Sequence, residues 1–226
     1  DLDVTFAVDR AGQVGADGAT HAGSFDISYA RCIPNMAILV PSDEAECRAM
    51  LQTAYEHKGP ALVRYPRGAG IGAAVGSKLE TLPWGRADLI MPGQGVALLV
   101  FGTLLDAARQ VAEKLGATLV NMRFVKPLDE DMVLKLAGDH RLLVTLEENV
   151  VQGGAGSAVN EVLHAAGIAT HVLNLGLPDV FIEQGTQAEQ LELAGLSTDQ
   201  IEQRIHTALA DLDDPGVQLN KVNTPV

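Results

Sequence analysis

Short apolar runs alternate with helix-length amphipathic stretches along most of this chain, and this alternation constrains the fold more than any other feature. The apolar runs have the length of strands and lie at residues 4–8, 36–40, 61–65, 96–101, 118–121, 141–146 and 170–175. Stretches with helical spacing lie at 25–31, after 41–44, and at 104–115, 129–137, 157–166 and 198–212. Parallel strands need a crossover connection, which is usually a helix. We therefore predict an α/β fold, with two three-layer α/β/α units and mostly parallel sheets.

A segment rich in glycine and proline separates the two predicted units. Residues 68–95 show little periodicity, although 85–91 is a candidate edge strand. We expect a first unit at 1–75, a linker at 76–95, a second unit at 96–212 and a tail at 213–226. The helix that follows Pro41 is expected to use Ser42 as its N-cap.

Composition argues against several classes of partner. The 226 residues carry a formal net charge of -13, which repels phosphate backbones, so we expect no nucleic-acid partner. Cys32 and Cys47 are too few for a disulfide framework or a cysteine-ligated metal site, and they suit a reducing, cytoplasmic compartment. No apolar run approaches the roughly 20 residues that span a bilayer, so no membrane partner is expected. The chain begins at Asp1 directly before an apolar strand, and we expect it to be part of a longer protein.

The glycine-rich segment 9–23 follows the first predicted strand and is the densest candidate site. Ligands of open α/β sheets bind at the carboxyl edge of the strands, and glycines let a ligand approach the backbone closely. Arg10, Asp17 and His21 supply a cation, a carboxylate and a group that exchanges a proton near neutral pH. The competing interpretation is a glycine-rich turn in which Asp17 and His21 have only local structural partners.

A second candidate site lies where the third predicted strand ends, in the sequence RYPRG at 64–68. The planar guanidinium group matches phosphate oxygens, and two arginines on an acidic chain indicate a specific anion site. If the strand continues to Tyr65, the side chains of Arg64 and Tyr65 face opposite sides of the sheet, so one of the two arginines is expected to be structural. We predict Arg67 as the anion ligand, and an inter-domain ion pair is the alternative.

A third segment, 147–156, lies between a predicted strand and a predicted helix and ends in the glycine-rich sequence GGAG. Glycines at a helix N-terminus can hold a phosphate. However, the third glycine of the dinucleotide fingerprint is absent, and so is a phosphate-binding Gly-Lys-Ser/Thr sequence. Close packing of a helix on the sheet, or against a partner subunit, is the better interpretation. The paired Glu147 and Glu148 are predicted to be a solvated strand end.

Together, these segments resemble the later part of the 1-deoxy-D-xylulose-5-phosphate synthase family, a branch of the transketolase-like thiamine-diphosphate enzymes. The motifs run in the family's order through almost the whole chain except the tail. They are AVDRAG at 7–12, GADGATH at 15–21, RCIP at 31–34, PSDE at 41–44, YPRG at 65–68, MRFVKPLD at 122–129, EEN at 147–149 with GGAG at 153–156, and LGLPD at 175–179. The resemblance implies part of a pyrimidine-binding domain followed by a transketolase C-terminal-like domain.

The resemblance also implies a reaction and a role for each site residue. The family condenses pyruvate with D-glyceraldehyde 3-phosphate, with loss of carbon dioxide, using thiamine diphosphate and Mg²⁺. By position, Arg10 and Arg67 match the phosphate-binding arginines of the family. Asp17 matches a carboxylate that contacts the acceptor, and His21 matches a histidine near the reacting groups, so these two are the catalytic candidates.

Other family features are not expected in this segment. The Gly-Asp-Gly motif for metal and diphosphate belongs to an earlier domain, as does the glutamate that activates the cofactor. We therefore expect no cofactor-binding or metal-binding residue here. The missing N-terminal portion of the same enzyme is the expected partner, without which we expect no activity, and the family implies a homodimer.

Two other interpretations stay open. The first is another transketolase-like enzyme, either a transketolase or the β subunit of a 2-oxo acid dehydrogenase. The second is a non-catalytic α/β module that binds a dinucleotide or serves assembly. The loop at 17–21 and the turn at 65–68 together favour the synthase.

Overall fold

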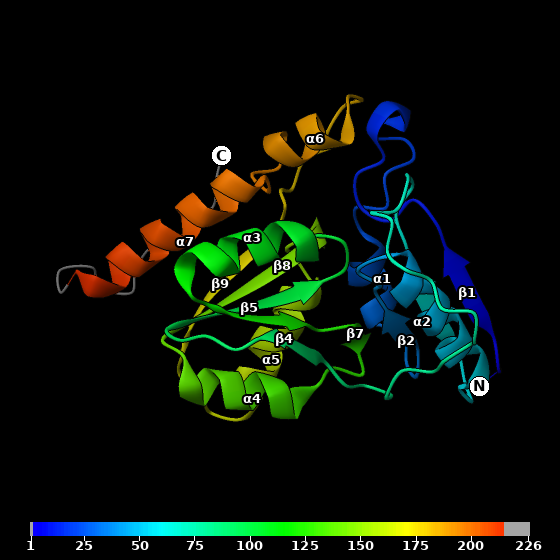
Figure 1. The fold of residues 1–226 in the computed structure, drawn as a ribbon, viewed down its shortest axis with the longest axis horizontal. Coiled ribbons are helices and arrows are strands. Elements are labelled where there is room, and N and C mark those ends of the chain that lie inside the picture. Colours follow the sequence, from blue (N-terminus) through cyan, green and yellow to red (C-terminus); the bar gives the residue numbers. More distant parts are fainter. Residues whose placement is uncertain (1, 215–226) are drawn as a thin grey trace.

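The computed structural model describes residues 2–214 and contains two mostly parallel sheets with helices packed around them (Figure 1). The strands are β1 (Thr5–Val8), β2 (Ala37–Leu39), β3 (Ala61–Arg64), β4 (Asp88–Met91), β5 (Val96–Phe101), β6 (Thr118–Asn121), β7 (Phe124–Lys126), β8 (Leu142–Val150) and β9 (His171–Leu177). The first sheet has the order β1-β3-β2-β7, and the second has the order β4-β6-β5-β8-β9. Only the pairs β2–β7 and β4–β6 are antiparallel among these strands. The predicted α/β class with mostly parallel sheets is confirmed.

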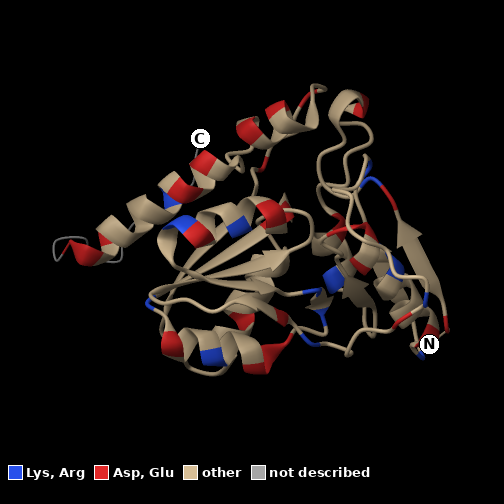
Figure 2. Ribbon diagram, in the orientation of Figure 1, with Lys and Arg blue, Asp and Glu red and all other residues tan. Residues whose placement is uncertain are grey.

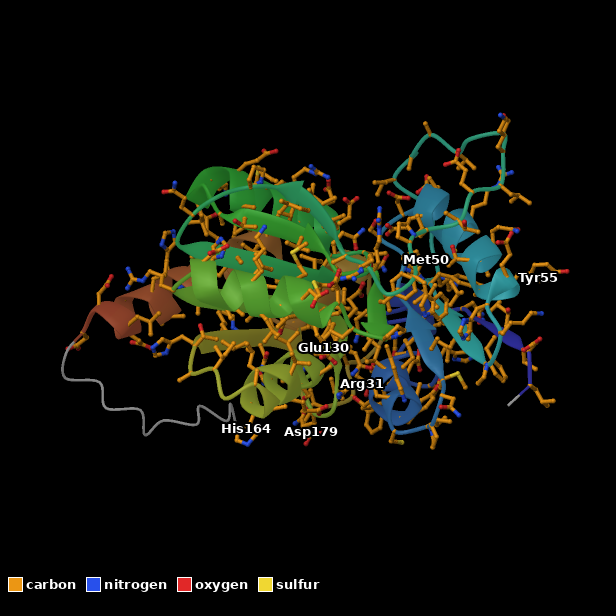
Figure 3. All side chains as sticks on the ribbon, turned by 90° about the horizontal axis from the view of Figure 1, so that it is seen from below. Arg31, Met50, Tyr55, Glu130, His164 and Asp179 are labelled. Carbon is orange, nitrogen blue, oxygen red and sulfur yellow. The ribbon has the colours of Figure 1, made fainter. Side chains whose placement is uncertain are left out.

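Two helices cover the first sheet, α1 (Asp26–Arg31) on one face and α2 (Glu44–Glu56) on the other. Met50 of α2 is completely buried against the sheet, whereas Tyr55 near the end of the same helix is exposed (Figure 3). The N-cap of α2 is Asp43, whose side chain accepts a hydrogen bond from the backbone N–H of Glu46. The prediction of Ser42 as N-cap is therefore wrong by one residue.

The second sheet lies between two pairs of helices (Figure 1). α3 (Leu105–Leu115) and α7 (Thr198–Asp213) cover one face, and α4 (Glu130–Asp139) and α5 (Ala155–Ala165) cover the other. Charged residues are concentrated on these outer helices, and the strands between them carry few (Figure 2). This arrangement explains the sequence pattern, because strands covered on both faces need continuous apolar runs.

Strand β7 leaves the second unit and completes the first sheet, where Phe124 pairs with Leu39 of β2. The side chain of Phe124 is completely buried in the core beneath α2. A division of the chain at residues 76–95 therefore separates the two sheets only in part. Three residues are too short for a recognisable strand pattern, which is why the sequence did not predict β7.

Two further features were not predicted from the sequence. One is a single 3₁₀ turn at Gly15–Asp17, and the other is α6 (Gln187–Leu193), which begins in a capping box formed by Thr186 and Glu189. Strand β8 also continues four residues beyond its predicted end, to Val150. The predicted tail at 213–226 lies, after Asp214, outside the described residues.

The two units are joined through a shared core and through arginine side chains. Arg31 of α1, labelled in Figure 3, donates to the carbonyl oxygens of Gly153 (2.7 Å) and Gly154 (3.0 Å) in the second unit. Arg123 bridges Glu46 of α2 and Asp88 of β4, at 2.8 Å in each case. These contacts join α1 and α2 of the first unit to the second unit.

Within residues 2–214, no helix combines the length and the apolar character that crossing a membrane requires.

Candidate functional site

The glycine-rich loop at 10–23 is closed at its base by backbone hydrogen bonds. The N–H of Gly23 donates to the carbonyl oxygen of Arg10 at 2.9 Å, and Gly12 and Gly23 exchange two bonds of 3.1 Å. A Cβ atom at Gly23 would lie 2.4 Å from the carbonyl oxygen of Arg10, so no larger residue fits. Arg10 itself has a φ of 59°, a left-handed conformation that costs energy for a residue with a side chain. The loop thus presents the Arg10 side chain from a strained backbone position.

Three of the four predicted site residues meet at one carboxylate. Oδ2 of Asp17 lies 3.3 Å from Nε of Arg10 and 3.1 Å from Nε of Arg67. Arg10 follows β1 and Arg67 follows β3, and these strands are parallel neighbours, so their carboxyl ends lie at the same edge of the sheet. Both arginine side chains are about half exposed, at 40% and 49%. The cluster is therefore open to a ligand from solvent.

His21 lies on the same loop but outside this ion cluster. Its Nδ1 is 2.8 Å from Oγ1 of Thr20, and its backbone N–H donates to the carbonyl oxygen of Gly18. The imidazole is exposed. The structure thus places His21 four residues from Asp17, with hydrogen-bond partners of its own within the loop.

A cavity of about 630 Å³ adjoins the cluster on the side of Arg67. It lies between the start of α2, the turn that follows β3, the start of α3 and α6, and its lining includes Tyr65, Thr103, Glu148 and Gln187. Arg10, Asp17 and His21 do not belong to its lining. Arg67 is consequently the predicted residue that connects the ion cluster to this cavity.

Arg64, the other arginine of the second candidate segment, has a structural role. It is buried, with Nε 3.3 Å from Oδ2 of Asp26. Its Nη2 donates to the carbonyl oxygens of Gly23 and Glu148, at 2.7 Å each. Arg64 therefore connects the loop base, α1 and β8, and the prediction that one of the two arginines is structural is confirmed.

Glu147 is buried, and the prediction of a solvated strand end is wrong because β8 continues through it. Its carboxylate accepts hydrogen bonds from the backbone N–H groups of Ala155 (2.7 Å) and Gly156 (2.8 Å) at the start of α5. Burial raises the pKa of Glu147 to about 7, against the opposite effect of these two donors. The carboxylate fills the place that a phosphate would take at this helix N-terminus, which argues against a nucleotide site there.

Glu148 faces the glycine-rich loop from the second unit. Its Oε1 accepts from the backbone N–H of Gln13 at 3.2 Å, and its Oε2 accepts from the hydroxyl of Thr103 at 2.7 Å. Burial raises the pKa of Glu148 as well. Sequence reasoning placed this side chain in solvent, because a strand end beside a glycine-rich segment is usually exposed.

Gln190 of α6 is a second residue that sequence reasoning missed. Its side chain is completely buried, and its Oε1 accepts from the backbone N–H of Gly15 at 2.7 Å. The capping-box pattern Thr-x-x-Glu at 186–189 could have revealed α6. No local signal could have shown its partner, because Gly15 lies 175 residues away in the sequence.

The described residues do not fit a diphosphate and its metal ion. Within residues 2–214, no three His, Cys, Asp or Glu side chains are grouped so that they could hold a metal ion. The glycine-flanked N-terminus of α5 is filled by Glu147.

Two family models match the chain: the transketolase pyrimidine-binding domain over residues 1–71 and the transketolase C-terminal domain over residues 85–201. The second match covers more than half of the chain, and the chain belongs to the transketolase family. Among solved structures it is similar to a split-gene transketolase described as an inactive beta4 tetramer. That similarity has a TM-score of 0.78 and 31% identity, and it covers 92% of this chain and 66% of the other.

The chain is also highly similar to proteins named 1-deoxy-D-xylulose-5-phosphate synthase. It is 59% identical over 216 residues to that of Chromohalobacter salexigens and 57% identical over 209 residues to that of Cellvibrio japonicus. The alignments cover 93% and 92% of this chain, but only 33% of each relative. The chain thus spans about a third of the length of the curated relatives it matches.

Proposed function

We propose that this chain is part of a thiamine-diphosphate-dependent 1-deoxy-D-xylulose-5-phosphate synthase and supplies the phosphate end of its acceptor site. The reaction would condense pyruvate with D-glyceraldehyde 3-phosphate and release carbon dioxide. The names of the relatives support the synthase over a transketolase or a dehydrogenase β subunit. The observation that carries the proposal is the convergence of Arg10 and Arg67 on Asp17.

Arg10 and Arg67 would bind the acceptor phosphate. Their contact with Asp17 uses the Nε atom of each arginine, and the Nη atoms of Arg67 take no part in it. Asp17 therefore holds two guanidinium groups at one point before any ligand binds. A planar guanidinium edge donates charge-assisted hydrogen bonds to phosphate oxygens, and groups that are already ordered lose less entropy on binding.

His21 would act at the other end of the three-carbon acceptor. Its imidazole is exposed, and imidazole is the side-chain group that most often serves as a general acid or base. Thiamine diphosphate and Mg²⁺ are assigned in this proposal to the rest of the protein, as is the donor substrate pyruvate. A homodimer is part of the same proposal, and the family supports it.

Replacement of Arg67 by alanine in the full-length enzyme tests the proposal. Because a charge-assisted hydrogen bond to phosphate is lost, KM for D-glyceraldehyde 3-phosphate should rise about 10- to 100-fold. KM for unphosphorylated D-glyceraldehyde should stay nearly unchanged. Steady-state kinetics with both acceptors measures the difference.

The matched control is Arg141→Ala, which removes an exposed arginine that pairs only with Asp213 among the described residues. It should leave both KM values as in the wild type. If Arg67→Ala raised KM equally for both acceptors, the result would show that this arginine does not bind the phosphate.

A further inference from the structure

We propose that Gln190 is a positioning residue that holds the glycine-rich loop at 10–23 from the second unit; this inference rests on the proposed function. Its carboxamide binds both backbone groups of one loop residue. Oε1 accepts from the N–H of Gly15 at 2.7 Å, and Nε2 donates to the carbonyl oxygen of Gly15 at 3.2 Å. Nε2 also donates to the carbonyl oxygen of Glu183 at 2.8 Å, which ties the carboxamide to the segment before α6.

The tip of the loop needs partners of this kind. Gly15 begins the 3₁₀ turn that ends at Asp17, and its backbone is buried in a left-handed conformation with a φ of 65°. Buried backbone N–H and carbonyl groups require hydrogen bonds. A Cβ atom at Gly18 would lie 3.1 Å from the side chain of Gln184, so the far side of the turn also packs closely on the second unit.

Two neighbouring contacts also hold the loop against the second unit. The N–H of Gln13 donates to Glu148 at 3.2 Å, and the carbonyl oxygen of Gln13 accepts from Nε2 of Gln187 at 3.3 Å. The backbone on both sides of Val14 is therefore held by side chains of the second unit. Gly15 is only two residues from Asp17, so a displaced turn would move the carboxylate that aligns Arg10 and Arg67.

The test compares Gln190→Leu with the wild type in the full-length enzyme. Leucine has a similar volume but makes none of the three hydrogen bonds. We expect KM for D-glyceraldehyde 3-phosphate to rise about tenfold, because the buried N–H of Gly15 loses its partner, while kcat changes much less. Hydrogen-deuterium exchange of the amides at 13–18 should become faster. The milder variant Gln187→Ala, which removes one bond to the loop, should change both quantities in the same direction.

Thr145→Val is the matched control, because it removes a completely buried hydroxyl that bonds to Asn174 in the same unit and does not contact the loop. It should leave KM and the loop exchange as in the wild type.

Exchange at 13–18 that stays slow in both glutamine variants would overturn the inference, whatever the substrate is. If amide exchange at 13–18 became faster while KM for D-glyceraldehyde 3-phosphate stayed unchanged, the proposed role of Gln190 in acceptor binding would be overturned. The exchange readout uses no substrate, so it is separate from the comparison of acceptors in Arg67→Ala, which tests the proposed function.

Discussion

At the scale of single residues, the buried carboxyl groups of Glu147 and Glu148 both serve as hydrogen-bond acceptors. A buried carboxylate is costly unless donors surround it. Glu147 receives two N–H groups from the start of α5, and Glu148 receives one N–H from the glycine-rich loop at 10–23 and one hydroxyl. The two side chains satisfy backbone groups that would otherwise be unpaired, at a helix start and at a loop.

Glu147 should make stability depend on pH. Its pKa is about 7 in the folded protein and near 4.5 in a solvated chain, so the folded state binds the extra proton between these values. The contribution of Glu147 is therefore full below pH 4.5 and is lost as the pH rises through about 7, by up to about 3 kcal/mol. The difference in free energy of unfolding between the wild type and Glu147→Gln should fall over this range. Denaturant unfolding at several pH values measures it.

Glu113→Gln serves as the control, because Glu113 is exposed on α3 and its difference from the wild type should not vary with pH. A pH-independent difference for Glu147→Gln as well would contradict the raised pKa.

At the scale of elements, the start of α5 depends on a side chain that lies elsewhere in the chain. The N-cap residue of α5 is Gly154, which makes no side-chain cap, and the cap is supplied by Glu147 from β8. By contrast, α6 and α7 carry capping boxes within their own first turns. The close approach of β8 to α5 leaves no room for a side chain at Gly154.

Substitution of glycine by alanine should therefore have opposite effects in neighbouring helices. A Cβ atom at Gly154 would lie 2.3 Å from Oε2 of Glu147, whereas nothing lies within 4 Å of one built at Gly138 in α4. We expect Gly154→Ala to lower the free energy of unfolding by about 1–3 kcal/mol. Gly138→Ala should raise it by about 0.5–1 kcal/mol, because the unfolded chain loses entropy. Thermal unfolding of both variants measures the two changes in stability. Changes of the same sign would contradict the close contact at Gly154.

At the scale of the whole molecule, the two units depend on each other for order. β7 passes from the second unit into the first sheet, and the side chains of Glu148 and Gln190 hold the loop that carries the candidate site. Arg123, directly before β7, has a φ of 58° and bridges both units. The site is therefore completed by packing between the units and not by the first unit alone.

Replacement of Arg123 by alanine should loosen this junction. Glu46, which is only 9% exposed, would lose its charged partner, and we expect a loss of about 2 kcal/mol in stability. Exchange of the amides in β7 should also become faster. Lys58→Ala is the control, because its pair with Asp3 is exposed at 87% and 57%, and its loss should destabilise the protein much less. Equal effects of the two variants would argue against a special role for Arg123.

Much of the fold and part of the site could be predicted from the sequence. The spacing of apolar residues is a local property, and it predicted most strands and the longer helices within a few residues. The resemblance to the synthase family grouped Arg10, Asp17 and Arg67, and these three side chains do lie together, although their role in binding stays a prediction. Strand-end positions on neighbouring parallel strands explain why the two arginines lie close together.

Only the tertiary structure decided how that site is held. The burial of Glu147 and Glu148, the transfer of β7 to the first sheet and the contact of Gln190 with Gly15 all join segments far apart in the chain. Apolar spacing is determined by neighbours in sequence, whereas burial and hydrogen-bond partners are determined by neighbours in space. For this reason the sequence by itself determined the elements and the chemistry that they carry, and packing determined their alignment.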